Sequence, residues 1–319
     1  MKVQHGITQY APPSYAIVTE GTFDGVHIGH RKILSSLVTA AQQAKQIDPC
    51  AESVVITFWP HPRLVLFPEQ QDLKLLSTFA EKTEALATIG IDRLVVLPFD
   101  KTFSNLTPEE YVQQILIAGL NTRQLIIGYD HRFGKNRTGD FNFLKNNEKR
   151  FGFTVEEIPR QDVEQVGVSS TKIRHALLQG EIATANRYLA APYSLSGKVV
   201  RGNQLGRALG FPTANLYISE TYKLIPKDGI YAVRVHLHQK VYNGMLYIGV
   251  RSTIGNQLER SIEVNIFDFE GDLYDKFLKI ELIAYLRGEE KFDSLETMKQ
   301  QLYRDRENAL RALHKTTIS

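Results

Sequence analysis

The feature that most constrains this chain is a glycine-rich stretch at residues 20–30, with the sequence EGTFDGVHIGH. An apolar run at 15–18 precedes it and predicts a buried strand, and apolar positions between 33 and 41 follow it at the spacing of an amphipathic helix. The stretch is therefore predicted to be a turn between a strand and a helix, at the carboxyl edge of a parallel sheet where open α/β folds bind ligands. The first N–H groups of such a helix attract phosphate.

Two histidines in this stretch suggest its chemistry. His27 and His30 are three residues apart, so both can face one bound group, donate hydrogen bonds to phosphate and stabilise a leaving pyrophosphate. A histidine pair alone is more often structural, and the surrounding glycines favour the catalytic interpretation. The H-x-G-H pattern resembles the signature of the nucleotidylyltransferase superfamily. The longer string F-D-G-V-H-x-G-H resembles the adenylyltransferase half of bacterial riboflavin kinase/FAD synthetases, so Gly21, Phe23 and Asp24 are also expected to bind ATP.

Length and composition limit the class of protein. A chain of 319 residues fits two domains better than one. Its formal charge of +3 is too small to indicate nucleic acid or an anionic membrane as a partner, and no apolar run reaches the length of a membrane span. The single cysteine, Cys50, excludes an intramolecular disulfide, and the N-terminus lacks a secretory signal. We therefore expect a cytoplasmic protein; the sequence does not decide between a monomer and a homo-oligomer.

Strands and helices alternate through the first half. Apolar runs at 53–58, 93–99, 124–128 and 154–158 predict further strands. Residues 79–89 have helical spacing, with Ser77 or Thr78 as the cap and Gly90 as the end, and a second helix opens at Thr107-Pro108. Repeated β–α units of this kind predict a parallel, doubly wound sheet, which is a Rossmann-like fold.

Two later stretches in this half resemble the same family. Residues 128–135 (GYDHRFGK) resemble its G-x-[ND]-F-x-F-G motif, with His131 in place of the commoner Phe, and the resemblance implies that Asp130 contacts the nucleotide or flavin. On pattern alone this segment would be a polar surface turn. Residues 57–62 (TFWPHP) match the family's T-F-x-P-H-P.

Residues 168–174 (VSSTKIR) predict a helix capped by Ser169 or Ser170, with basic side chains in its first turns. By itself this pattern would indicate a capped helix with solvated charges. It resembles the superfamily motif I-S-S-T-x-[IR]-R, and this resemblance assigns Ser170, Thr171 and Arg174 to the phosphates of ATP.

The pattern changes near residue 187. We expect a turn-rich connection at 190–197 and place the domain boundary just before it, giving domains at 1–186 and 187–319. Short strands are predicted at 198–201, 230–236, 244–250, 262–269 and 277–285, a spacing typical of a small antiparallel barrel. The chain is expected to end in a helix from Ser294 to about His314. An Asp293–Glu296 capping box would open this helix, and its buried stripe would begin at Leu295 and continue through Met298, Leu302, Ala309, Leu310 and Leu313.

The second half has its own motif at residues 206–216, GRALGFPTANL. Thr213 and Asn215 alternate on an extended segment, so both oxygens face one side and suit a Mg²⁺ that shares ATP phosphates. A Thr-x-Asn alone would more often be a polar turn. The whole string resembles the riboflavin kinase motif G-R-x-L-G-F-P-T-A-N, which also implies that Gly206 binds ATP.

A later strand carries a candidate base. Glu263 and Asn265 share the face opposite Ile262 and Val264, so Glu263 is either a base for phosphoryl transfer or an exposed strand residue. It matches the catalytic glutamate of the family's E-V-x-x-[LF]-D stretch. Ser252 stands where the family's N-I-G-x-x-P-T has proline. Arg287 is expected to face the flavin.

The resemblance covers nearly the whole chain and implies a bifunctional enzyme. One module would phosphorylate riboflavin with ATP and Mg²⁺ to give FMN, and the other would transfer AMP from ATP to FMN, giving FAD and pyrophosphate. Two alternatives remain. The first module could adenylylate another phosphate, such as that of a pantetheine or nicotinate derivative, although such relatives lack the riboflavin kinase motif. The protein could instead be a non-catalytic flavin or nucleotide sensor, which would have lost the polar site residues present here.

Overall fold

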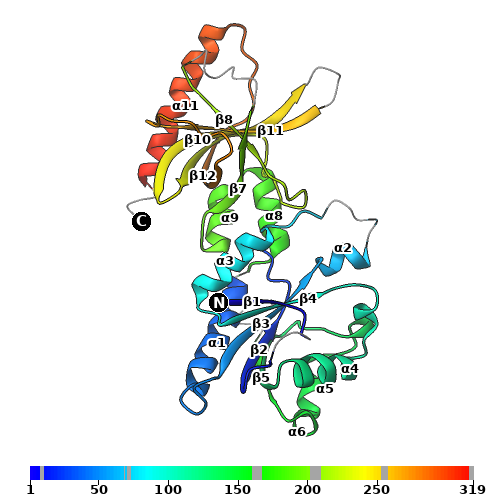
Figure 1. Cartoon of the computed structure of the whole chain (residues 1–319). Coiled ribbons are helices and arrows are strands. Elements are labelled where there is room, and N and C mark those ends of the chain that lie inside the picture. The colour runs from blue at the N-terminus through cyan, green and yellow to red at the C-terminus, as the bar shows by residue number, and fades with distance from the viewer. Residues whose placement is uncertain are drawn as a thin grey trace. The chain divides into compact units, whose positions relative to one another are not determined.

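The computed structural model describes residues 1–7, 11–67, 69, 73–159, 167–201, 210–252 and 258–315, without the side chains at 251, 252, 258 and 259. The chain divides into two compact units, Met1–Ser170 and Thr171–Ser319, and each is described by itself (Figure 1).

The first unit is built on a six-stranded sheet in the order β1-β4-β3-β2-β5-β6, in which every neighbouring pair is parallel. The strands are β1 (Lys2–His5), β2 (Ala16–Glu20), β3 (Glu52–Trp59), β4 (Arg93–Pro98), β5 (Thr122–Gly128) and β6 (Thr154–Ile158). The predicted doubly wound sheet is confirmed, and β1 is an edge strand that the sequence did not indicate. β2 pairs with β3 on one side and β5 on the other, so the chain order reverses between β2 and β5, where such folds form their binding crevice.

Both faces of this sheet are buried. Val54 and Ile56 of β3 pack into one apolar cluster and Val55 packs into another on the opposite face. The helical segments of the unit are α1 (Ile28–Ala44), α2 (Pro62–Leu66), α3 (Phe79–Ile89), η1 (Phe103–Asn105), α4 (Pro108–Tyr111), η2 (Val112–Gly119), η3 (Lys135–Arg137), α5 (Phe141–Asn146) and α6 (Glu148–Phe151). The helix expected at 79–89 has those bounds, with Thr78 and Glu81 in a capping box and Gly90 at φ +96°.

The second unit begins at Thr171, the second residue of α8 (Ser170–Gln179). It also contains α9 (Ile182–Leu189) and a closed antiparallel barrel with the strand order β10-β11-β8-β7-β12-β9. The barrel strands are β7 (Tyr193–Val200), β8 (Ala214–Tyr217), β9 (Gly229–Leu237), β10 (Lys240–Ser252), β11 (Leu258–Ile266) and β12 (Phe277–Arg287). The predicted barrel is confirmed. The turn-rich connection expected at 190–197 is partly wrong, because β7 already begins at Tyr193. Tyr193, Leu195 and Gly197 alternate as buried residues and pair with β12.

The final helix, α11 (Leu295–Lys315), was predicted almost to the residue, but its cap was not. The Ser294 hydroxyl accepts a hydrogen bond from the Thr297 N–H at 3.1 Å, because Ser294 directly precedes the first helical residue. The expected Asp293–Glu296 box is therefore wrong. Leu295 is 71% exposed and leaves the expected buried stripe, whereas Asp305 is 1% exposed and lies within it.

Candidate functional site

The glycine-rich turn joins β2 to α1, as predicted. His27 caps α1, and its Nδ1 accepts a hydrogen bond from the His30 N–H at 3.3 Å. The two imidazole rings stack with centroids 3.6 Å apart, and the Phe23 ring meets His30 edge-on at 5.2 Å. Phe23 and Val26 are buried at positive φ, +47° and +42°, a conformation that non-glycine residues keep only where packing fixes it. The structure thus brings the predicted histidine pair together on this turn.

The protonation of His30 is set by its surroundings. Burial lowers the pKa of His30 well below its usual value, and the charges of His27 and Lys82 lower it further. The buried Nδ1 of His30 has no hydrogen-bond partner among the described residues. His30 is therefore a neutral imidazole at physiological pH, with one N–H to donate.

Asp24 connects this turn to two other segments. It is 4% exposed, and its Oδ1 accepts the N–H groups of Leu76 at 2.8 Å and Ser77 at 3.3 Å. Its backbone carbonyl accepts the hydroxyl of Ser170 at 3.1 Å. Asp24 thereby positions Ser170, a predicted phosphate ligand, against the turn. Gly21, the other residue expected to bind ATP here, is half-buried at the start of the turn.

Sequence reasoning missed Lys82 of α3 as part of this site. Its side chain is buried, and Nζ donates to the Thr22 carbonyl at 3.2 Å and to the Thr57 hydroxyl at 3.0 Å. Burial lowers the pKa of Lys82 to about 8, although the negative charge of Asp24 opposes this shift. The signal was a lysine among the apolar positions of an amphipathic helix, where lysine is almost never buried without a partner.

A polar cluster lies at the ends of β2 and β5. The carboxylate of Glu20 is 2.7 Å from Nε2 of His131 and also accepts the hydroxyl of Tyr111. Asp130, predicted to contact nucleotide or flavin, is exposed immediately before His131. On α8, in the second unit, Thr171 is exposed and Arg174 is half-buried; their assignment to phosphates stays a prediction.

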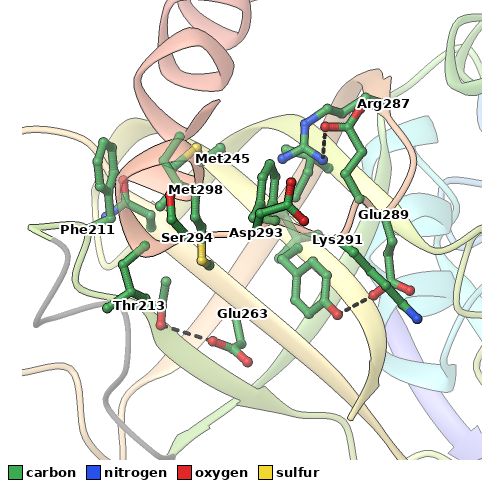
Figure 2. A pocket seen from close by; sticks show the side chains of 18 residues that line it. Phe211, Thr213, Met245, Glu263, Arg287, Glu289, Lys291, Asp293, Ser294 and Met298 are labelled. Atoms are coloured by element: carbon green, nitrogen blue, oxygen red, sulfur yellow. Dashed lines mark hydrogen bonds and ion pairs between the residues drawn. The ribbon is translucent and has the colours of Figure 1, made fainter. Parts of the chain in front are cut away.

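The second unit contains a pocket of about 800 Å³ (Figure 2). It is lined by residues of β10, β11, the segment after β12 and α11. Glu263 of β11 lies opposite Tyr247 of β10, so both side chains share the face that lines this pocket. Its apolar lining includes Phe211, Met245, Met298 and Leu302.

Glu263 is 5% exposed, so the alternative of an exposed strand glutamate is wrong. Its Oε2 accepts the Thr213 hydroxyl at 3.1 Å, which Figure 2 shows as a dashed line, and its Oε1 accepts the Ser261 hydroxyl at 2.7 Å. Asn215 of β8 is the direct ladder partner of Glu263. The structure therefore gathers the predicted base and both predicted metal ligands at one place.

Among the described residues, no three His, Cys, Asp or Glu side chains cluster as a metal site. A hydroxyl and an amide carbonyl beside one carboxylate instead form a sparse oxygen donor set, which suits a Mg²⁺ that keeps waters and phosphate ligands. Gly206 and the following residues through 209 lie outside the described part of the chain, as does the Ser252 side chain.

Arg287 lines the same pocket, but its guanidinium is engaged by α11. Nε and one terminal nitrogen bond the Asp305 carboxylate at 2.9 and 2.7 Å. Burial opposes the charge, yet the hydrogen bonds and charge of Asp305 outweigh it and raise the pKa of Arg287. Tyr247 donates to Glu289 nearby.

Two family matches correspond to these two sites. Residues 10–172 match the FAD synthetase family and residues 189–313 match the riboflavin kinase family. The fold and sites thus define a two-module protein of flavin nucleotide synthesis.

Relatives match along most of their length. The chain is 36% identical to the bifunctional riboflavin kinase/FMN adenylyltransferase of Listeria monocytogenes, covering 92% of this chain and 90% of that protein. It is 35% identical to the same enzyme of Pseudomonas fluorescens, covering 96% of each. The chain belongs to the family of bifunctional riboflavin kinases/FMN adenylyltransferases, which confirms the family expected from its motifs.

A crystal structure described as a macrolide-efflux protein from Streptococcus pneumoniae is also similar. It aligns with a TM-score of 0.85 and 32% identity over 96% of this chain and 98% of that one. In the described part of our chain, no helix has the length and apolar character needed to cross a membrane.

Proposed function

We propose that the barrel module phosphorylates riboflavin to FMN and that the sheet module adenylylates FMN to FAD. Both family matches support this division, and they fall on either side of the boundary that we propose between residues 186 and 187. The observation that carries the kinase assignment is the buried Glu263, bonded to Thr213 and opposite Asn215 in a pocket large enough for a flavin.

In the kinase reaction, Glu263 takes the proton of the primary ribityl hydroxyl as that oxygen attacks the γ-phosphorus of ATP. The P–O bond to ADP breaks, and ADP leaves with the bonding electrons. Thr213 and Asn215 would hold Mg²⁺, which neutralises phosphate charge when bound. Gly206 would bind ATP, the apolar lining would contact the isoalloxazine ring, and Arg287 would lie toward it.

In the adenylyl transfer, an oxygen of the FMN phosphate attacks the α-phosphorus of ATP and pyrophosphate leaves. The nucleophile is already anionic, so no base is needed and positioning with charge stabilisation supplies the catalysis. We assign His27 and His30 to the leaving pyrophosphate, and Ser170, Thr171 and Arg174 to the phosphates of ATP. Gly21, Phe23 and Asp24 shape the turn at which ATP binds, and Asp130 contacts nucleotide or flavin.

The partners of this chain are then small molecules: ATP, riboflavin, FMN and FAD. We propose a cytoplasmic location and no nucleic acid or membrane partner, in keeping with a formal charge of +3.

A chromatographic time course of the purified protein with riboflavin, ATP and Mg²⁺ tests this proposal. FMN should form first and then give way to FAD. FMN alone would leave the kinase and require another substrate for the histidine site, whereas neither product would favour a non-catalytic binding protein.

A further inference from the structure

Lys82 places a buried ammonium directly behind the glycine-rich turn. Its side chain is 7% exposed, and its two described hydrogen bonds go to the Thr22 carbonyl and the Thr57 hydroxyl. An ammonium has three donors, and Lys82 also borders a small cavity with His61 and Ser77. Burying a charge is costly, so a lysine in this position needs a compensating role.

Lys82 bonds the carbonyl of Thr22, at the place where the chain leaves β2 and enters the turn. Thr22 directly precedes Phe23, which is at positive φ and whose ring contacts His30. Thr57 belongs to β3, the neighbour of β2 in the sheet. The ammonium therefore links the turn to the sheet at Thr22, one residue before Phe23, whose ring packs against His30.

The charged and titratable groups around Lys82 come from four segments. Asp24 on the turn attracts Lys82, and the charge of Lys82 acts on His30 of α1, which stacks on the N-cap His27. His61 follows β3 and lines the same small cavity, and Glu81 of α3 caps its own helix. The carboxylate of Asp24 also accepts hydrogen bonds from two backbone N–H groups, so Asp24 by itself does not neutralise the charge of Lys82. Positive charge at this turn also attracts the phosphates of ATP.

This inference rests on the proposed adenylyl transfer. We propose that Lys82 is a positioning residue of that site, which anchors the turn through Thr22 and Thr57 and places a positive charge near His30. Neutral His30 keeps one nitrogen free of a proton and donates from the other, while the fixed positive charge stays with the lysine.

The test compares Lys82→Gln, which keeps an N–H donor without charge, with Lys82→Arg, which keeps the charge. Lys149→Gln is the control for losing a lysine from the same unit, because Lys149 of α6 is exposed. Lys82→Met replaces the Gln variant if that does not fold. Each protein is assayed for FMN-to-FAD conversion across pH, and for riboflavin phosphorylation as a check that the chain is intact.

In Lys82→Gln we expect kcat/KM for ATP to fall roughly tenfold or more, and the acid limb of its pH profile to move to higher pH. Above about pH 8, where wild-type Lys82 loses its charge, the wild-type rate should approach that of the Gln variant. Lys82→Arg and Lys149→Gln should keep the wild-type acid limb.

A readout independent of activity is the NMR titration of ¹³C-labelled histidines, with His30 assigned from a His30→Gln variant. The His30 midpoint should rise in Lys82→Gln and stay unchanged in Lys149→Gln. An unchanged midpoint with equal rate loss at every pH would overturn the electrostatic role, and an unchanged rate would overturn the positioning role. If the wild type makes no FAD while the His30 midpoint still responds, the proposed function fails and the charge coupling stands.

Discussion

The imidazole of His131 lies 2.7 Å from the carboxylate of Glu20, at the point where the sheet order reverses. Glu20 ends β2, and His131 follows β5 directly after Asp130. Tyr111 of α4 donates its hydroxyl to the same carboxylate, and burial together with Glu20 raises the pKa of Tyr111 well above its usual value. A carboxylate, a histidine and a neutral tyrosine thus hold the segment that carries Asp130 in place.

Replacing Glu20 by Leu should destabilise the first unit by about 1–3 kcal/mol, because the buried Tyr111 hydroxyl loses its acceptor. It should also raise KM in FAD formation, because His131 no longer anchors the segment with Asp130. Trp59 is the only tryptophan and lies in this unit, so its fluorescence in urea reports the unfolding. The double variant Glu20→Leu/Tyr111→Phe should recover part of the stability. Equal losses in the single and double variants would contradict this account.

Replacing Glu263 by Ala should lower the rate of FMN formation by roughly 10²–10⁴-fold, because the ribityl hydroxyl loses its proton acceptor. FMN-to-FAD conversion should remain largely intact. Glu270, which is exposed, provides the matched Glu→Ala control. Near wild-type phosphorylation of riboflavin by Glu263→Ala would show that Glu263 is not the base.

Replacing His30 by Ala should have the converse effect. FAD formation should fall by roughly 100-fold or more, because a neutral donor to the leaving pyrophosphate is lost, and FMN should accumulate in the time course. The exposed His5 of β1 serves as the His→Ala control in the same unit. Unchanged FAD production in His30→Ala would remove this residue from the mechanism.

The Arg287–Asp305 pair predicts a stability effect in the barrel unit. Asp305→Asn should cost about 1.5–3 kcal/mol, because the guanidinium loses its charge-assisted bonds to Asp305 and, among the described residues, keeps an ion pair only with the more distant carboxylate of Glu290 at 3.8 Å. Riboflavin binding, followed by quenching of flavin fluorescence, should weaken, since both α11 and Arg287 line the pocket. Glu307→Gln removes a carboxylate from an exposed pair on the same helix and should change stability by less than about 0.5 kcal/mol. Equal effects of the two substitutions would contradict the role of the buried pair.

Lys82 also predicts how stability depends on pH. Its pKa is about 8 in the folded protein and 10.5 ordinarily, so between these values the unfolded chain binds more protons than the folded one. Stability of the first unit should therefore rise with pH across this window, by up to about 3 kcal/mol from this group. Lys82→Met should lack that contribution. The measurement is the urea midpoint of unfolding, followed by Trp59 fluorescence and compared between the wild type and Lys82→Met from pH 7.5 to 10.5. Parallel curves for the two proteins would contradict a buried charged Lys82.

Local sequence patterns determined much of this protein. Helix α3 begins after a Thr78–Glu81 capping box and ends at a left-handed Gly90, and both signals are contained within a few residues. The apolar runs of the strands, and the glycine turn with His27 and His30, are equally local. The family motifs fixed the order of the modules, because each motif is a contiguous string.

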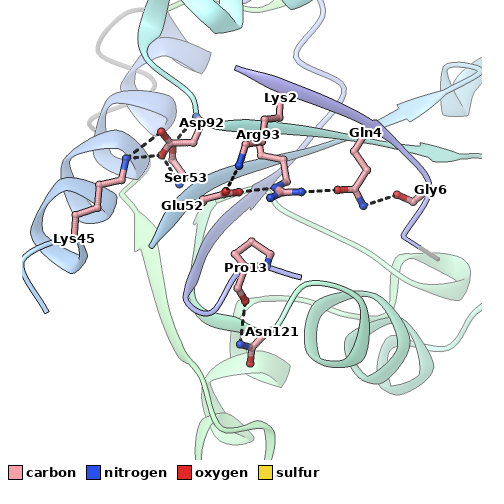
Figure 3. Close-up of polar contacts among 10 residues, drawn as sticks. All are labelled: Lys2, Gln4, Gly6, Pro13, Lys45, Glu52, Ser53, Asp92, Arg93 and Asn121. Carbon is pink, nitrogen blue, oxygen red and sulfur yellow. Dashed lines mark hydrogen bonds and ion pairs between the residues drawn. The ribbon is translucent and has the colours of Figure 1, made fainter. Parts of the chain in front are cut away.

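Contacts between distant segments were decided only by the tertiary structure. Strand β1 has no apolar run, and it is held by pairing with β4 and by a polar network from far along the chain, in which Arg93 joins Gln4 to Glu52 (Figure 3). Lys82 behind the turn and Asp305 beneath Arg287 likewise depend on partners that a helical pattern does not reveal. The physical reason is the same in each case. A buried polar side chain needs a hydrogen-bond or charge partner, and in these cases the partner belongs to a distant segment that local sequence spacing does not reveal.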